Sequence, residues 1–298
     1  MIQPDFRVGY LYSLAPIHCG GEGDLGNILE IARESHTNFP YIPGSSLRGS
    51  LRNEVTLQDP EIADTLFGRE LQKDGQMGVH QVWFGDARLL WVPMRTMSLE
   101  GSDSVFCWVS CHSLLRDHAL LCRQPLPVLP RTPVGTKPGV YVVADAEVHV
   151  EKLPEGQTFS LVGEWPAVLQ GDTQKTWKHN RIILPDSDFQ ILMEHSLWTQ
   201  IRNKIQEDPE GANQVGSAEV FWTDVCIPRD TILYFTWGYS PLPHQQDLTQ
   251  EHEILINILQ GLFQVGGQAN VGRGWVQGWV SNASPPALQA KSENTAGV

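Results

Sequence analysis

Serine and arginine residues between positions 45 and 52 could form a phosphate site. Pro43-Gly44 breaks the chain, and Ser45 or Ser46 can then begin a helix whose apolar residues recur every four positions. Such a start carries free backbone N–H groups and the positive end of the helix dipole, which favour an anion. Arg48 and Arg52 lie one turn apart and form a cationic fork suited to phosphates. The alternative is that the serines only cap the helix and the arginines face solvent.

A glycine-rich segment near the C-terminus could form a second phosphate site. Glycine has no side chain to hinder close approach, so the backbone at Gly266, Gly267 and Gly272 could reach a phosphate. Arg273 would supply the cation, and Asn270 lies between the glycines. The alternative is that these glycines only permit a turn.

Another glycine-rich segment, residues 20–26, follows the first predicted strand. It matches the G-x-G-x-x-G pattern of dinucleotide-binding proteins, which requires glycines directly after a strand and at the start of a helix. Here residues 15–19 intervene, and no pattern of paired parallel strands follows. The sequence therefore argues against a dinucleotide site.

The composition limits the function classes. The 298 residues carry 34 Asp and Glu against 21 Lys and Arg, which gives a net charge of −13. Nucleic-acid binding by bulk attraction is excluded, so it must come from a local group of cations and N–H donors. No charged leader precedes an apolar stretch, and no apolar run approaches the roughly 20 residues of a membrane span. We expect a cytoplasmic protein with no membrane partner.

The five cysteines indicate neither a metal site nor a disulfide framework. Their number is odd, no Cys-x-x-Cys pair is present, and Cys107 and Cys111 on an alternating strand are typical of core packing. We therefore expect no structural metal and a reducing compartment. The segment from Gly44 to Gly49 is not a nucleophile elbow, because its second glycine comes one residue too late.

Hydrophobic periodicity predicts an α+β fold. Alternating residues indicate strands over 6–12, 81–92, 105–110, 140–150, 158–163, 215–222, 231–237 and 275–280. Four-residue spacing indicates helices that cover 45–55, 61–67, 186–196 and 249–265. With insertions removed, the elements follow the order strand, helix, two strands, helix, strand. This order matches a ferredoxin-like (RRM-like) βαββαβ core with both helices on one face. In this assignment, strands 81–92 and 105–110 are the central pair.

The sequence predicts one domain over residues 1–281, with large insertions that carry specialised function. One insertion covers about residues 112–180, and a second, 197–224, is predicted to be a β-hairpin arm. Residues 282–298 lack periodicity and are expected to form a disordered tail.

The predicted arm would hold two cations on one face. A turn at residues 208–211 favours a hairpin, in which Arg202 and Lys204 lie two positions apart on one strand. The alternative is that residues 201–205 extend the preceding helix.

Five segments carry motifs that bear on the family of the chain. They are His36–Gly49, Phe84–Thr96, Arg181–Asp186, Ile227–Tyr234 and Gly266–Gly274. The first and last resemble motifs of the RAMP superfamily, the RNA-binding subunits of type III CRISPR effector complexes. The middle three resemble the backbone subunit of the type III-B (Cmr) complexes. The resemblance covers roughly residues 6–281.

The resemblance implies copies of this subunit that lie along a guide (CRISPR) RNA and present it to target RNA. Other effector subunits would be partners, and this scaffold role needs no cofactor. It also implies RNA contacts from His18, Gly20 and Gly21, although a lone histidine is often only a satisfied polar residue. A second hypothesis is a RAMP endoribonuclease that processes the guide precursor, with His18 as general base. A third, a small-molecule enzyme, has no coherent catalytic constellation to support it.

The resemblance also bears on cleavage of target RNA. In active relatives, an aspartate shortly after the glycine-rich loop carries metal-dependent cleavage, and Ile28 or Leu29 falls at that place here. Asp24, Glu30 and Asp224 are the carboxylates that could compensate. Because loss of a metal-binding carboxylate lowers the affinity for a hard cation, we expect a degraded cleavage centre. If cleavage is retained, it should need Mg²⁺ or Mn²⁺.

Overall fold

The computed structural model describes residues 6–20, 27–68, 80–99, 105–125, 131–153, 165–205, 218–240 and 248–280. Gly21, Asp24, the turn of the predicted arm, the strand predicted at 158–163 and the predicted tail lie outside these ranges. Within the described residues, no helix has the length and apolar character needed to cross a membrane.

The described residues form a mixed α+β fold, as the sequence predicts. The α-helices are α1 Gly44–Gln58, α2 Pro60–Phe67, α3 His112–Leu121, α4 Asp172–His179, α5 Asp186–Glu194 and α6 Thr249–Leu259. The strands are β1 Arg7–Ser13, β2 Ile28–Leu29, β3 Tyr41–Ile42, β4 Val82–Phe84, β5 Ala87–Ser98, β6 Phe106–Cys111, β7 Val134–Gly135, β8 Gly139–Val143, β9 Ala146–Lys152, β10 Arg181–Leu184, β11 Trp198–Ile205, β12 Ala218–Cys226, β13 Ile232–Tyr239, β14 Leu262–Gln264 and β15 Trp275–Val280.

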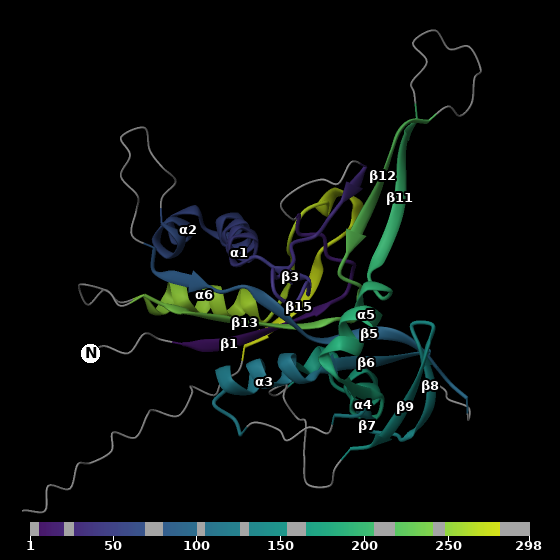
Figure 1. The fold of residues 1–298 in the computed structure, drawn as a ribbon. Coiled ribbons are helices and arrows are strands. Elements are labelled where there is room, and N and C mark those ends of the chain that lie inside the picture. Colours follow the sequence, from purple (N-terminus) through teal and green to yellow (C-terminus); the bar gives the residue numbers. More distant parts are fainter. Residues whose placement is uncertain are drawn as a thin grey trace, which may run out of the picture.

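Four strands and two helices form the centre of the molecule (Figure 1). The strands follow the order β15-β1-β13-β5, and each neighbouring pair is antiparallel. Helices α1 and α6 contact each other, and their buried leucines share one hydrophobic cluster with Leu11, Phe235 and Val276 of the sheet. In chain order, these elements read strand, helix, strand, strand, helix, strand.

The structure corrects the predicted central pair of strands. The neighbour of β5 in this unit is β13, whereas β6, predicted as a central strand, pairs with the other edge of β5. β6 continues into α3, a helix that the sequence analysis missed, and it pairs in parallel with β10. Periodicity identifies strands but not their neighbours, because pairing depends on residues far apart in the chain.

Other boundaries also differ from the sequence prediction. The strand predicted at 140–150 is the hairpin β8–β9, whose turn residues Ala144 and Asp145 both have positive φ, as tight hairpin turns require. Helix α6 ends at Leu259, and the apolar residues that would continue its face belong to β14, which pairs with β15. The predicted helix end at Val265 is therefore wrong.

The hairpin arm is confirmed. β11 and β12 pair antiparallel from Trp198 opposite Cys226 to Ile205 opposite Ala218. The two strands extend away from the sheet, and β2 pairs with β12 near the base of the arm (Figure 1). The alternative, an extended helix over 201–205, is wrong.

Buried side chains cover both faces of the large sheet. One cluster lies under α1, α2 and α6, and the other contains Trp91, Trp108, Trp165, Trp177 and Trp279. Cys107 and Cys111 are buried, as core packing predicts. Each fully buried large apolar side chain contributes about 1.5–3 kcal/mol, so these clusters hold the insertions against the central unit.

Candidate nucleic-acid interface

The start of α1 differs from the predicted phosphate site. The cap position is Pro43, no side chain of α1 caps the helix, and the Gly44 N–H donates to Asp86 Oδ1 at 2.7 Å. Ser45 is exposed and Ser46 is half-buried, so the prediction that a serine caps the helix is wrong. Asp86 places a carboxylate where an anion would bind, so this helix start is partly neutralised. The sequence analysis did not identify Asp86, because it precedes β5 and is far from Gly44 in the sequence.

The predicted arginine fork exists, but it points toward α2. The Arg48 guanidinium donates to the Phe67 carbonyl at the end of α2 and lies 5.6 Å from the Phe67 ring centroid. Arg52 lies 3.4 Å from Asp64. Burial, and then the nearby charge of Arg52, lower the pKa of Arg48, as expected for two neighbouring cations. Both arginines therefore hold α2 against α1, since a cation is favourable at a helix C-terminus.

The glycines of the C-terminal loop serve different purposes. Gly266 and Gly274 have φ near +80°, and a Cβ would overlap the carbonyl oxygens of His18 and Val265 respectively. Gly272 has φ +79°, but a Cβ there would meet no atom within 4 Å. Two glycines are therefore required by packing, and Gly272 faces open space. Asn270 is exposed beside it.

His18 joins this loop to the base of the arm. The residue is 8% exposed, and its ring Nδ1 donates to the Val225 carbonyl of β12 at 2.9 Å. Its own carbonyl accepts from the Gly267 N–H at 2.8 Å. Gly20, two residues further along, is exposed. His18, the C-terminal loop and the base of the arm thus meet at one place, which sequence spacing alone could not show.

Arg273 is not the exposed cation that the sequence predicts. It is 4% exposed, and Nη1 lies 3.0 Å from Asp224 Oδ2 and 3.0 Å from Cys226 Sγ. Nη2 donates to Gln200 Oε1 at 2.9 Å, and the guanidinium lies 4.6 Å from the Trp198 ring centroid. The base of the arm covers this side chain and removes it from solvent.

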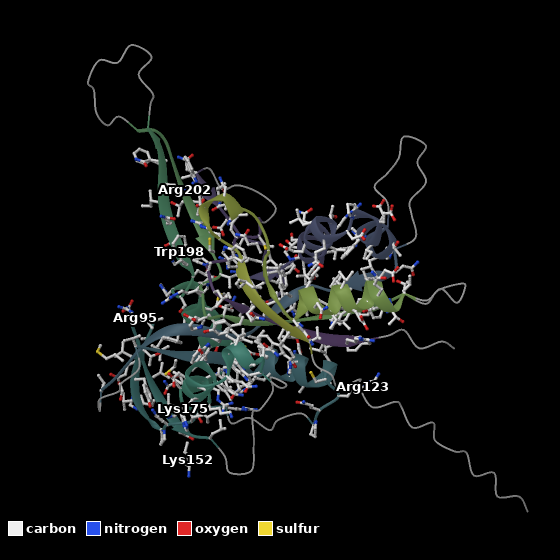
Figure 2. The ribbon with its side chains drawn as sticks, turned by 180° about the vertical axis from the view of Figure 1, so that it is seen from behind. Arg95, Arg123, Lys152, Lys175, Trp198 and Arg202 are labelled. Carbon is white, nitrogen blue, oxygen red and sulfur yellow. The ribbon has the colours of Figure 1, made fainter. Side chains whose placement is uncertain are left out.

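The arm itself retains a partly exposed cation. The Arg202 side chain is 31% exposed, lies 3.4 Å from Asp224 Oδ2 and stacks 5.5 Å from the Trp222 ring centroid. Figure 2 shows Arg202 further along the arm than Trp198. Lys204 is the residue of β11 opposite Val220, and its side chain lies outside the described part of the structure.

Two of the three candidate catalytic carboxylates, Glu30 and Asp224, lie within the described residues, and each has an arginine close to it. Glu30 lies 3.7 Å from Arg33, and Asp224 is completely buried against two arginines. Leu29 is the direct partner of Asp224 in the β2–β12 ladder, so an apolar side chain lies beside that carboxylate. A hydrated Mg²⁺ needs accessible oxygen ligands, and this donor set does not fit one. Within the described ranges, no group of three or more His, Cys, Asp or Glu could hold a metal.

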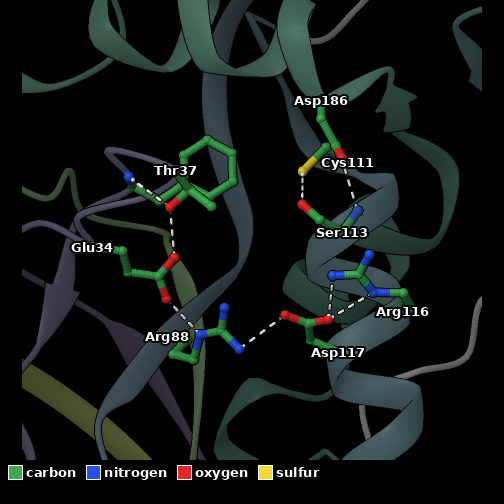
Figure 3. Close-up of polar contacts among 9 residues, drawn as sticks. Glu34, Thr37, Arg88, Cys111, Ser113, Arg116, Asp117 and Asp186 are labelled. Carbon is green, nitrogen blue, oxygen red and sulfur yellow. Dashed lines mark hydrogen bonds and ion pairs between the residues drawn. The ribbon is translucent and has the colours of Figure 1, made fainter.

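A polar cavity of about 310 Å³ was missed by the sequence analysis. It lies where the parallel strands β6 and β10 end and α3 and α5 begin. Arg88 donates to Glu34 at 2.6 Å and to Asp117 at 3.0 Å, and Arg116 also donates to Asp117 (Figure 3). Asp186 accepts from the Ser113 N–H at 2.9 Å. Four distant segments build this cavity, so no spacing in the sequence signals it.

Comparison with known proteins identifies the family. The family model described as RAMP superfamily matches residues 10–277. The Pyrococcus furiosus protein named CRISPR system Cmr endoribonuclease Cmr4 is 30% identical over 285 residues, which cover 90% of this chain and 92% of that protein.

Solved structures agree with this assignment. A crystal structure of oligomeric Cmr4 from Pyrococcus furiosus has a TM-score of 0.66 at 24% identity and covers 94% of this chain and 98% of its own. A cryo-EM structure of type III-B Cmr-beta bound to cognate target RNA has a TM-score of 0.69 at 15% identity and covers 92% and 96%. Both show the same fold. The chain therefore belongs to the RAMP superfamily and, within it, is Cmr4-like.

Proposed function

We propose that this protein is an RNA-binding backbone subunit of a cytoplasmic type III-B CRISPR ribonucleoprotein. It holds guide RNA and presents it to target RNA, with copies of itself and other effector subunits as partners. The βαββαβ unit of β1, α1, β5, β13, α6 and β15 is the ferredoxin-like core of this subunit. The observation that carries the proposal is the convergence of the C-terminal glycine loop, the His18 segment and the base of the arm.

This surface offers several kinds of RNA contact. Gly20, Gly267 and Gly272 expose backbone that a phosphate can approach. Arg202 supplies a partly exposed charge, and Trp198 and Trp222 are half-buried aromatic rings along the arm. Single-stranded RNA is commonly bound by a cationic track with aromatic side chains along it. Ser45 contributes an exposed hydroxyl, whereas Arg48 and Arg52 are engaged with α2.

The cleavage centre is degraded in this proposal. Leu29 and Ile28 supply no metal ligand at the place of the family aspartate, and Asp224 is shielded from solvent. Glu30 has one carboxylate oxygen, Oε2, that is buried without a hydrogen-bond partner and lies 3.7 Å from Arg33 Nη2.

The alternative is that target cleavage is retained. It is favoured by the name of the Pyrococcus furiosus relative, which is an endoribonuclease. In that case, Glu30, Asp24 or Asp224 would have to bind Mg²⁺ or Mn²⁺ after a local rearrangement. Guide processing with His18 as general base is a further alternative, since the Nδ1 donation to Val225 leaves Nε2 free to accept a proton.

Co-purification tests the scaffold role and cleavage together. The chain is expressed with its operon partners, bound RNA is sequenced, and guide-paired target RNA is added with Mg²⁺ or Mn²⁺. We expect a bound guide RNA and intact target. Absence of guide RNA contradicts the scaffold role. Target cleavage that Glu30→Ala or Asp24→Ala abolishes identifies an active centre, and precursor cleavage that His18→Ala abolishes identifies a processing enzyme.

A further inference from the structure

A buried group of charges joins the arm to the C-terminal glycine loop. Asp224 of β12 is 0% exposed, and its Oδ2 lies 3.0 Å from Nη1 of Arg273 and 3.4 Å from Nη1 of Arg202. Arg273 belongs to the loop, and Arg202 belongs to β11. One carboxylate oxygen therefore contacts guanidinium groups from two elements that are far apart in the sequence.

Aromatic rings fix the orientation of both guanidinium groups. Arg273 lies over Trp198 and Arg202 lies over Trp222. In the β11–β12 register, Trp198 is opposite Cys226, Gln200 opposite Asp224 and Arg202 opposite Trp222. Residues directly opposite each other, and those two apart along a strand, share a face. All these side chains therefore lie on the face of the arm that meets the loop.

The two arginines differ in what they can reach. The Arg273 side chain is 5% exposed and that of Arg202 is 31% exposed. A buried charge that loses its partner is strongly unfavourable, so Asp224 and Arg273 depend on each other. Arg202 retains an exposed portion that a phosphate can contact. The Arg273 guanidinium therefore pairs with groups inside the protein, whereas part of the Arg202 side chain remains accessible to a phosphate.

We propose that Asp224 and Arg273 are positioning residues that set the angle of the arm against the glycine loop, and that Arg202 is the phosphate-binding cation they hold in place. This inference rests on the proposed RNA-binding function. It replaces the sequence-based roles of Arg273 as a phosphate ligand and of Asp224 as a catalytic acid.

Salt dependence separates the two arginines. Binding of the full-length protein to a fluorescein-labelled single-stranded RNA is measured over a range of salt concentrations. Each phosphate contact contributes about 0.7 to the slope of log K against log salt on a single strand. We expect Arg202→Gln to lower the slope by about that amount and Arg202→Lys to restore it. Arg273→Gln should weaken binding with a smaller fall in slope than Arg202→Gln, because Arg202 is still present but less well positioned. Arg273→Lys should not restore affinity, because lysine lacks the planar fork that meets three partners.

The geometry of the arm is measured separately. Spin labels at Thr199 of the arm and Ala269 of the loop, both exposed, report their separation in a Cys122→Ser background. We expect a narrow distance distribution in the wild type and a broader one in Asp224→Asn and Arg273→Gln. Asp117→Asn is the matched control, because it removes a carboxylate from the Arg88 ion pair away from the arm. It should leave the distribution and the salt slope unchanged.

Two results would overturn the inference. One is a fall in slope for Arg273→Gln equal to that for Arg202→Gln, and the other is an unchanged distance distribution in Asp224→Asn. If a single variant fails to fold, Asp224→Asn/Arg273→Gln removes both buried charges together and should fold more stably than either single variant. Lack of RNA binding by the wild type would refute the proposed function, while the distance measurement would still test the positioning role.

Discussion

Alanine at two glycines of the same loop should affect stability and RNA binding in opposite orders. Gly272 and Gly274 have nearly the same φ, +79° and +80°, but only Gly272 faces open space. A left-handed conformation costs an L-residue about 1–2 kcal/mol, which the lower entropy of the unfolded chain partly offsets. We therefore expect Gly272→Ala to lower the free energy of unfolding by about 1 kcal/mol.

Gly274→Ala carries the same conformational cost and a steric one. Its Cβ would overlap the Val265 carbonyl oxygen. The backbone shift that relieves this overlap breaks two backbone hydrogen bonds. The Val265 N–H donates to the Gly274 carbonyl at 2.9 Å, and the Gly274 N–H donates to the Pro16 carbonyl at 2.9 Å. Each is worth about 1 kcal/mol, so the total loss is roughly 3–4 kcal/mol. In a chain of this size, that corresponds to roughly 6 °C in Tm, against roughly 2 °C for Gly272→Ala.

RNA binding should follow the opposite order. A methyl group at Gly272 occupies the space through which a phosphate would approach, and loss of one such contact lowers affinity on the order of tenfold. Gly171→Ala is the control, because Gly171 has φ +87°, open space around its Cβ and a place outside the loop. Tm by calorimetry and affinity by fluorescence anisotropy are measured for all three variants. If Gly272→Ala binds RNA as tightly as Gly171→Ala does, the loop is not a phosphate site.

Three further outcomes follow from the structure. Leu29→Asp places a carboxylate at the position where the family resemblance expects the catalytic aspartate, and we expect it to confer Mg²⁺- or Mn²⁺-dependent target cleavage on the guide-loaded complex; efficient cleavage by the wild type would contradict this. Arg48→Ala loses the Phe67 contacts and should cost about 1–2 kcal/mol in urea unfolding, with an unchanged salt slope; a lower slope would restore Arg48 as a phosphate ligand. Burial lowers the pKa of His118 to about 4, so its stabilising contribution is complete above the unfolded pKa of about 6.5 and is lost as pH falls toward 4. Between pH 7 and 5 this group should account for about 2 kcal/mol of lost stability, and a His118→Gln variant with the same pH dependence would refute that assignment.

The sequence predicted local features well because their causes are local. Leu47, Leu51 and Val55 are spaced for one helix face, and all three are completely buried in α1. Alternation and a turn signal identified the arm.

The contacts and the burial of individual side chains could not be predicted in this way, because they depend on residues far apart in the sequence. Nothing near Arg273 in the sequence indicates that Trp198 and Asp224 cover it, and nothing near Gly44 indicates that Asp86 accepts its N–H. The sequence pattern of an arginine next to glycines is the same whether the arginine faces solvent or pairs with a buried carboxylate. The sequence therefore identified the loop as glycine-rich, but it did not predict that Arg273 is buried.

A chain with a net charge of −13 that binds RNA should show a small salt dependence for each subunit. Arginines within the described ranges already lie close to carboxylates: Arg33 at 2.6 Å from Glu194, Arg52 at 3.4 Å from Asp64, Arg88 at 2.6 Å from Glu34 and Arg273 at 3.0 Å from Asp224. A guanidinium that is paired inside the protein releases few counterions from RNA.

Backbone N–H groups and stacking then carry most of the affinity, and they contribute little to the salt slope. With Arg202 as the main phosphate contact, we expect a slope of about 1 for each bound subunit between about 50 and 200 mM salt. The measurement is fluorescence anisotropy with an RNA long enough for one copy. A slope of about 3 or more would mean that other cations meet the phosphates, with Lys204 as the first candidate, and its Lys204→Gln variant would then lower the slope.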